Sequence, residues 1–132
     1  MHVVDSPEVI ARLVEAVDRK QFGVHMDLAN LINSPRAYWN SGAVIRSAVS
    51  LFGDRIVSAH AKDIQMEEAC DNIRLREVQP GHGNLDYRAY LGALHGLTQD
   101  VPLMMEHLPN EHDYDEAAKY IRSQAVIAGV SL

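Results

Sequence analysis

Helix-like and strand-like segments alternate along nearly all of this 132-residue chain, and this alternation is what most constrains its fold. Apolar residues recurring every three or four positions predict helices over about 6–20, 33–52, 85–97 and 114–128. Short apolar runs between these helices predict strands over about 22–28, 55–60, 73–79 and 101–106. This order is typical of parallel strands joined by helical crossovers, with both faces of the sheet covered.

The ends of several elements carry recognisable signals. Ser6, Pro7 and Glu8 form a helix start, because a serine hydroxyl caps free amides, proline suits the first helical position and glutamate favours the positive end. Residues 62–72 are polar without a clear period, which predicts a loop. Residues 80–83 (PGHG) predict a turn, and their glycines alone are only a weak sign of a phosphate-binding loop.

The number of elements indicates half of a barrel. A (β/α)8 barrel uses about 250 residues for eight strand–helix units, and four strands in 132 residues have that same density. We therefore expect an α/β fold that is half of a (β/α)8 TIM barrel, with four parallel strands and flanking helices in a single domain, 1–132. An open flavodoxin-like sheet also fits the order of elements, but no loop offers a convincing nucleotide or flavin site.

Composition and charge exclude several classes of function. The chain has 18 acidic against 12 basic residues and a net charge of −6, which argues against a nucleic-acid-binding surface. Its apolar runs are shorter than the roughly 18 residues that a membrane helix needs, and no signal peptide is recognisable. A single cysteine, Cys70, excludes an intramolecular disulfide. We expect a cytoplasmic protein without a membrane or nucleic-acid partner.

Polar side chains gather where the predicted strands end, which is where parallel α/β folds place their ligands. Asp27, His60 and Glu106 follow three of the strands at similar depth. Any one of them alone is often just the first solvated residue after a strand. Together they offer oxygen and nitrogen ligands without sulfur, a set that suits a divalent ion such as Mn, Mg, Co or Zn.

Three further polar residues near these ends have two interpretations each. His25 shares a face with Asp27, because strand side chains alternate, and we expect it to be a hydrogen-bonded interior histidine rather than a direct ligand. Lys62 and Asp63 are either a surface ion pair, which contributes little to stability, or groups that bind substrate.

Four segments in order resemble the xylose-isomerase-like sugar phosphate isomerases and epimerases, whose fold is a (β/α)8 barrel with a metal at its mouth. The likeness covers the whole chain and matches the carboxyl-terminal half of that barrel, strands five to eight. Residues 23–30 (GVHMDLAN) resemble the fifth strand and residues 60–63 (HAKD) the sixth. Residues 80–87 (PGHGNLDY) resemble the turn after the seventh strand and residues 102–107 (PLMMEH) the eighth.

The resemblance implies an isomerase or epimerase of carbohydrate metabolism that acts on a sugar or sugar phosphate. It implies that Asp27, His60 and Glu106 are metal ligands, and that Glu106 is also a catalytic carboxylate. In that chemistry a proton next to a carbonyl is moved while a metal stabilises the enediolate. Lys62, Asp63 and His25 are the candidate substrate-binding residues.

The chain also departs from the family pattern. The family's fourth ligand is a glutamate of strand four, which would lie before Met1, and Asn30 and Met66 replace a histidine and an arginine of some members. We therefore expect catalysis to be incomplete in this chain. Its open sheet edges predict a homo-oligomer that closes the half-barrel. The alternatives are a non-catalytic truncated module that self-associates or binds a partner half, and an endonuclease IV-like phosphodiesterase, against which the negative charge counts.

Overall fold

The structure is a computed structural model that describes residues 4–69 and 72–131. Cys70 therefore lies outside the described residues. The helices are α1 (Pro7–Val17), α2 (Leu28–Leu31), α3 (Pro35–Trp39), α4 (Ser41–Phe52), the 3-10 turn η1 (Gly53–Arg55), α5 (Tyr87–His95) and α6 (Glu111–Ala128). The strands are β1 (Val24–Asp27), β2 (Ile56–His60), β3 (Asp63–Ala69), β4 (Asn72–Val78) and β5 (Leu103–Met104). None of the described helices combines the length and the apolar character that crossing a bilayer requires.

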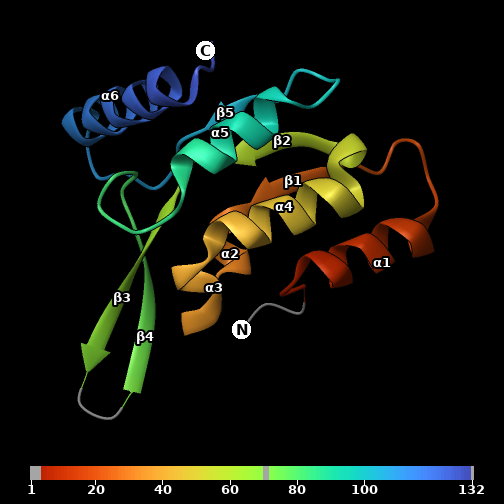
Figure 1. Ribbon diagram of the computed structural model, residues 1–132, viewed down its shortest axis with the longest axis horizontal. Coiled ribbons are helices and arrows are strands. Elements are labelled where there is room, and N and C mark those ends of the chain that lie inside the picture. Colours follow the sequence, from red (N-terminus) through yellow and green to blue (C-terminus); the bar gives the residue numbers. More distant parts are fainter. Residues whose placement is uncertain (1–3, 70–71, 132) are drawn as a thin grey trace.

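The centre of the molecule is a parallel sheet of three strands in the order β1-β2-β5, and the prediction of four parallel strands was wrong. Helix α1 packs on α4, α4 on α5 and α5 on α6, so these helices form one layer along the sheet (Figure 1). Both β1 and β5 are edge strands within the described residues. The place of this segment among the eight strands of a barrel stays a prediction.

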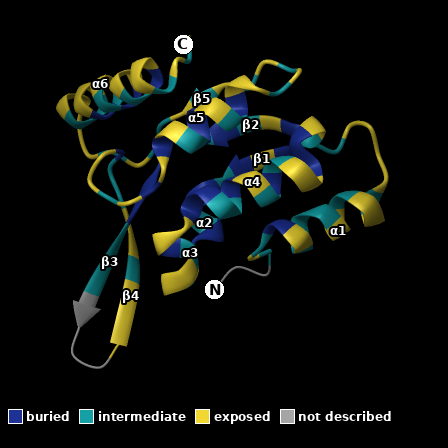
Figure 2. Ribbon diagram, in the orientation of Figure 1, coloured by how far each residue is buried: buried dark blue, intermediate teal, exposed yellow. Residues whose placement is uncertain are grey.

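The core lies between the helix layer and the sheet. On β1, Val24 and Met26 are buried while His25 is exposed, as the two-residue period of a strand requires. The buried core also includes Ile45, Ala48 and Phe52 of α4, Ile56 and Ala59 of β2, Tyr87, Tyr90 and Leu91 of α5, and Ile121 and Ala125 of α6. Figure 2 shows these buried residues concentrated where α4 and α5 meet the strands. The opposite face, here called the open face, presents polar side chains.

Strands β3 and β4 form an antiparallel hairpin that projects from the body of the protein (Figure 1). Two predictions fail here: 62–72 is not a loop over its described part, and the strand predicted over 73–79 is not in the parallel sheet. A parallel connection needs a dozen or more residues, whereas β3 ends at Ala69 and β4 begins at Asn72. Residues 63–67 (DIQME) alternate polar with apolar side chains, which is the signal of a half-buried strand that the loop prediction missed.

The predicted helices are largely confirmed, with changes at their ends. The N–H of Val9 donates to Ser6 Oγ at 3.4 Å, so Ser6 caps α1 as predicted. The helix predicted over 33–52 is broken at Asn40 into α3 and α4. Helix α6 begins at Glu111, before the predicted residue 114, because the Asn110 side chain accepts from the N–H of Asp113.

Candidate metal centre

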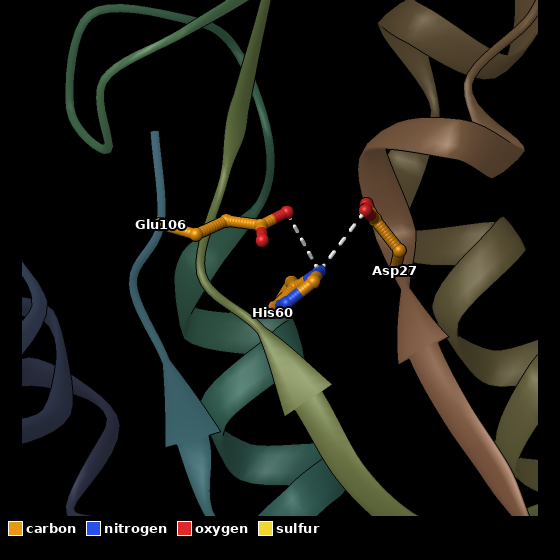
Figure 3. Close-up of side chains that lie close together, drawn as sticks. All are labelled: Asp27, His60 and Glu106. Atoms are coloured by element: carbon orange, nitrogen blue, oxygen red, sulfur yellow. Dashed lines mark hydrogen bonds and ion pairs between the residues drawn. The ribbon is translucent and has the colours of Figure 1, made fainter. Parts of the chain in front are cut away.

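Asp27, His60 and Glu106 converge at the carboxyl ends of the parallel strands, as Figure 3 shows. One ligand atom from each residue lies within 4.8 Å of the others. The Nδ1 atom of His60 is 3.2 Å from Asp27 Oδ2 and 3.2 Å from Glu106 Oε1. All three side chains are partly buried, so the three predicted ligands form one shared cluster.

Strand register explains this convergence. Asp27 is in register with His60, and His60 with Met104, and residues in register on neighbouring parallel strands point to the same face. Glu106 follows Met104 by two residues, which returns its side chain to that face. The cluster therefore lies on the open face, away from the helix layer.

Lys62 completes the cluster as its central positive charge. Its Nζ atom lies 2.6 Å from Glu106 Oε1, 3.0 Å from Asp27 Oδ2 and 3.2 Å from Glu77 Oε2 of β4. Burial lowers the pKa of Lys62, but the hydrogen bonds with three carboxylates outweigh burial and hold this pKa above its ordinary value. The same ammonium, through its hydrogen bond, lowers the pKa of Glu106, so Glu106 is a carboxylate at neutral pH.

The residues present fit a divalent cation. Asp27 Oδ1 is buried and, among the described residues, has no hydrogen-bond partner, although buried polar atoms are nearly always paired. The donor set is two carboxylates and an imidazole, which suits Mg, Mn, Co or Zn. The carboxylates of Asp27, Glu77 and Glu106 carry three negative charges, whereas Lys62 carries one positive charge. A divalent ion would neutralise the excess of two.

Two tyrosines of α5 hold the backbone that carries His60 and Lys62. The hydroxyl of Tyr87 donates to the carbonyl of Lys62 at 2.8 Å, and that of Tyr90 donates to the carbonyl of His60 at 3.2 Å. Burial raises the pKa of both phenols, so they stay donors. The sequence analysis missed this role. The signal is the spacing of three residues, which places both hydroxyls on one face of the helix.

Asp63 has a role other than the predicted substrate binding. Its side chain is 0% exposed, and its oxygens accept from the N–H groups of Ile64, Gly81, Gly83 and Leu85 at 2.9–3.1 Å. Burial raises the pKa of Asp63, and these four bonds oppose the rise. Gly83 is required here, because a Cβ would collide with Asp63 Oδ1 and the Ile64 carbonyl. Asp63 therefore fixes the loop between β4 and α5, which includes the predicted turn.

His25 lies on the open face rather than in the interior, contrary to our expectation, because the described chain covers the sheet with helices on one side only. The expected hydrogen bond is present, since its Nδ1 is 2.6 Å from Ser58 Oγ. Its ring meets the His60 ring edge-on, with centroids 4.0 Å apart. This contact restricts how the His60 ring can turn. A direct contact of His25 with substrate stays a prediction.

A polar cavity of about 580 Å³ opens beside the cluster, between the hairpin and the segment after β5. Its wall includes Lys62 and Glu106 of the cluster, together with Glu77, which contacts Lys62. The other polar wall residues are Gln65, Arg76, Gln79, His82, His107 and Asp113. The volume falls in the range of small-molecule sites, and the lining supplies donors and acceptors suited to a hydroxyl-rich molecule.

Comparisons with known proteins agree with the geometry. The family model described as xylose isomerase-like TIM barrel matches residues 1–124. No curated protein matches the chain. A xylose isomerase domain protein from Planctomyces limnophilus is similar over 96% of this chain and 44% of its own, with 22% identity and a TM-score of 0.71. A xylose isomerase-like TIM barrel protein from Mycobacterium smegmatis was solved in complex with magnesium. It is similar over 93% of this chain and 40% of its own, with 17% identity and a TM-score of 0.66.

These two similarities concern the fold, because both identities are below 25%. The chain spans less than half the length of either solved protein.

Proposed function

Because the chain belongs to the xylose isomerase-like TIM barrel family, we propose that it carries the metal centre of an isomerase or epimerase acting on a sugar or sugar phosphate. The observation that carries this proposal is the convergence of Asp27, His60 and Glu106 at the carboxyl ends of parallel strands, beside a polar cavity. Ligand sites of parallel α/β folds lie at these ends.

Asp27, His60 and Glu106 would hold the metal ion. The orphaned Asp27 Oδ1 and the excess negative charge support this role, as does the magnesium in the similar Mycobacterium smegmatis protein. When bound, a divalent ion would polarise the carbonyl of a sugar and so favour loss of the adjacent proton. Mn, Mg, Co and Zn all suit the donor set.

Glu106 is the residue that we assign to proton transfer. Its side chain is 29% exposed and lines the cavity, so a substrate carbon can reach its carboxylate. Its pKa is lowered, chiefly by the hydrogen bond from Lys62, so the group is ionised at neutral pH and can accept a proton. Lys62 contacts Glu106 and His25 contacts His60, and we assign both to hydrogen bonding of substrate oxygens.

Proton exchange tests the proposed chemistry. Because catalysis is expected to be incomplete in this chain, the step measured is proton removal by Glu106 and not net isomerisation. With Mn²⁺ or Mg²⁺ in D₂O, the protein is expected to exchange the proton next to the carbonyl of a ketose or ketose phosphate, detected by NMR across a panel of sugars. Glu106→Gln is expected to slow this exchange at least about 100-fold, because it removes the base. Glu116→Gln, an exposed residue of α6, serves as the control. Exchange that is absent for every sugar, or unchanged by Glu106→Gln, contradicts the proposal.

Self-association is a further part of the proposed assembly. The sheet has two unpaired edges within the described residues, and exposed edges invite pairing with another chain. Val57 and Met104 are 57% and 42% exposed. We propose that two copies associate through the sheet. Each copy contributes the three parallel strands of the described residues. A dimer therefore contains six parallel strands and does not complete the eight strands of the predicted barrel.

Light scattering coupled to size-exclusion chromatography measures this association. The expected mass is at least twice the 14.7 kDa of one chain. Met104→Lys, on the edge strand β5, is expected to decrease this mass. A single species of 14.7 kDa at micromolar concentration contradicts self-association.

A further inference from the structure

The position of Lys62 has a consequence for how the cluster takes up a metal ion. Its Nζ atom contacts Asp27 Oδ2 and Glu106 Oε1, the same two oxygens that lie 3.2 Å from His60 Nδ1. The candidate metal ligands are Asp27, His60 and Glu106. The ammonium thus occupies one oxygen of each of the two candidate carboxylate ligands.

A second cation close to this ammonium meets strong repulsion. Two like charges a few ångströms apart repel strongly where the effective dielectric constant is low, and the Lys62 side chain is only 8% exposed. A divalent ion that coordinates Asp27 Oδ2 or Glu106 Oε1 therefore requires Lys62 to release that oxygen, and an ion held by the orphaned Asp27 Oδ1 still lies close to the ammonium. The cost of this release is subtracted from the intrinsic affinity of the three ligands.

Glu77 provides a second partner for the ammonium. Its Oε2 is 3.2 Å from Lys62 Nζ, and its side chain is 40% exposed at the base of the hairpin. Glu77 does not belong to the group whose ligand atoms converge. A lysine that leaves Asp27 and Glu106 can therefore keep a carboxylate partner without entering solvent as an unpaired charge.

We propose that Lys62 is an internal competitor of the divalent cation, and that Glu77 accepts its ammonium when the cation binds. This inference rests on the proposed metal centre and adds what sets its affinity. Because the ammonium stays in the site on Glu77, a monovalent ion would neutralise only one of the two excess negative charges, whereas a divalent ion would neutralise both.

Isothermal titration of the metal-free protein with Mn²⁺ and Mg²⁺ tests the competition. Lys62→Gln removes the charge and is expected to tighten Mn²⁺ binding at least tenfold. Lys62→Arg keeps the charge and is expected to change the affinity less than threefold. The control is Lys119→Gln, which removes an exposed lysine of α6 that pairs with Glu116 and is expected to leave the Mn²⁺ affinity unchanged. Equal or weaker Mn²⁺ binding by Lys62→Gln overturns the proposal.

A double-mutant cycle tests the part played by Glu77. Glu77→Gln is expected to weaken Mn²⁺ binding at least threefold in the wild-type background and to have a smaller effect when Lys62 is already glutamine. Equal weakening in both backgrounds overturns the assignment, because it makes Glu77 a metal ligand or a general source of negative charge.

The outcomes separate this inference from the metal centre itself. Metal binding by the wild type without tightening in Lys62→Gln overturns only the competition. Binding by Lys62→Gln but not by the wild type supports it. Absence of binding in both proteins overturns the metal centre and the competition together. Thermal unfolding is recorded for Lys62→Gln and Lys62→Met. Loss of cooperative unfolding in both makes the ammonium a structural requirement and also overturns the proposal.

Discussion

Asp63→Ala is expected to lower the free energy of unfolding by at least about 4 kcal/mol. Four backbone N–H groups donate to this carboxylate, and a buried donor left without an acceptor costs about 1–3 kcal/mol. The Asp63 side chain is fully buried, so water does not reach these donors unless the loop opens. Urea or guanidinium unfolding followed by circular dichroism measures the change.

Two variants control this experiment. Asp63→Asn keeps one oxygen acceptor and is expected to lose less stability than Asp63→Ala. Asp54→Ala removes an exposed aspartate of η1 and is expected to stay within about 0.5 kcal/mol of wild type. A loss below about 1 kcal/mol in Asp63→Ala contradicts the anchoring of the loop by this residue.

Asp27→Asn is expected to weaken divalent-metal binding at least about 100-fold. The substitution keeps the size of the side chain but removes its charge. It also replaces one carboxylate oxygen by an NH₂ group, and Mn²⁺ and Mg²⁺ prefer oxygen ligands. The orphaned Oδ1 shows that the wild-type carboxylate has coordination capacity left over. Isothermal titration with Mn²⁺ measures the affinity, and thermal unfolding without metal checks that the variant is folded.

The same titration with His60→Ala and Glu106→Gln extends this test to the other two ligands. Both are expected to weaken binding by at least about tenfold, because each removes one of the three converging ligand atoms. Asp54→Asn is the matched control, an exposed aspartate of η1 that precedes β2, whereas His60 ends that strand. Wild-type affinity in all three cluster variants contradicts the shared site.

The candidate ligands were predictable from the sequence because strand geometry is local. Asp27 and His60 end apolar runs, Glu106 closely follows one, and parallel strands align their carboxyl ends. Two features were enough to place three residues from distant parts of the chain together: the two-residue period of each strand and the order of the strands. The helices were predictable for a similar reason, since their apolar periods reflect the layer that they form over the sheet.

The hairpin was not predictable from these features. Both strands alternate apolar with polar residues, at Ile64 and Met66 and at Ile73 and Leu75, but such alternation indicates a strand without indicating its partner. Its pairing depends on cross-strand contacts such as the ion pair between Arg76 and Glu67 at 2.8 Å, which no period along a single segment reports. The strand over 73–79 was recognised, but its partner was not, and a parallel strand was counted in error.

The roles of Lys62 and Asp63 also depend on long-range structure. Both were considered as substrate-binding residues because they follow a strand. Adjacent residues of an extended chain point in opposite directions, and here one side chain enters the metal cluster while the other is buried under the turn at 80–83. The return of the chain after β4 supplies three of the four N–H groups that donate to Asp63, those of Gly81, Gly83 and Leu85.

Asp63 anchors the loop between β4 and α5. The metal cluster and the hairpin can therefore change independently of each other. The loop from Gly81 to Leu85 is tied to Asp63 at the start of β3. Insertions or deletions between Gln65 and Arg76 would therefore leave the spacing of Asp27, His60 and Glu106 intact. Gln65 and Arg76 both line the cavity, so such changes would act on the cavity through these two residues. Hairpin length is thus a variable through which sequences of this architecture can diverge in the molecules they accept while keeping one metal centre.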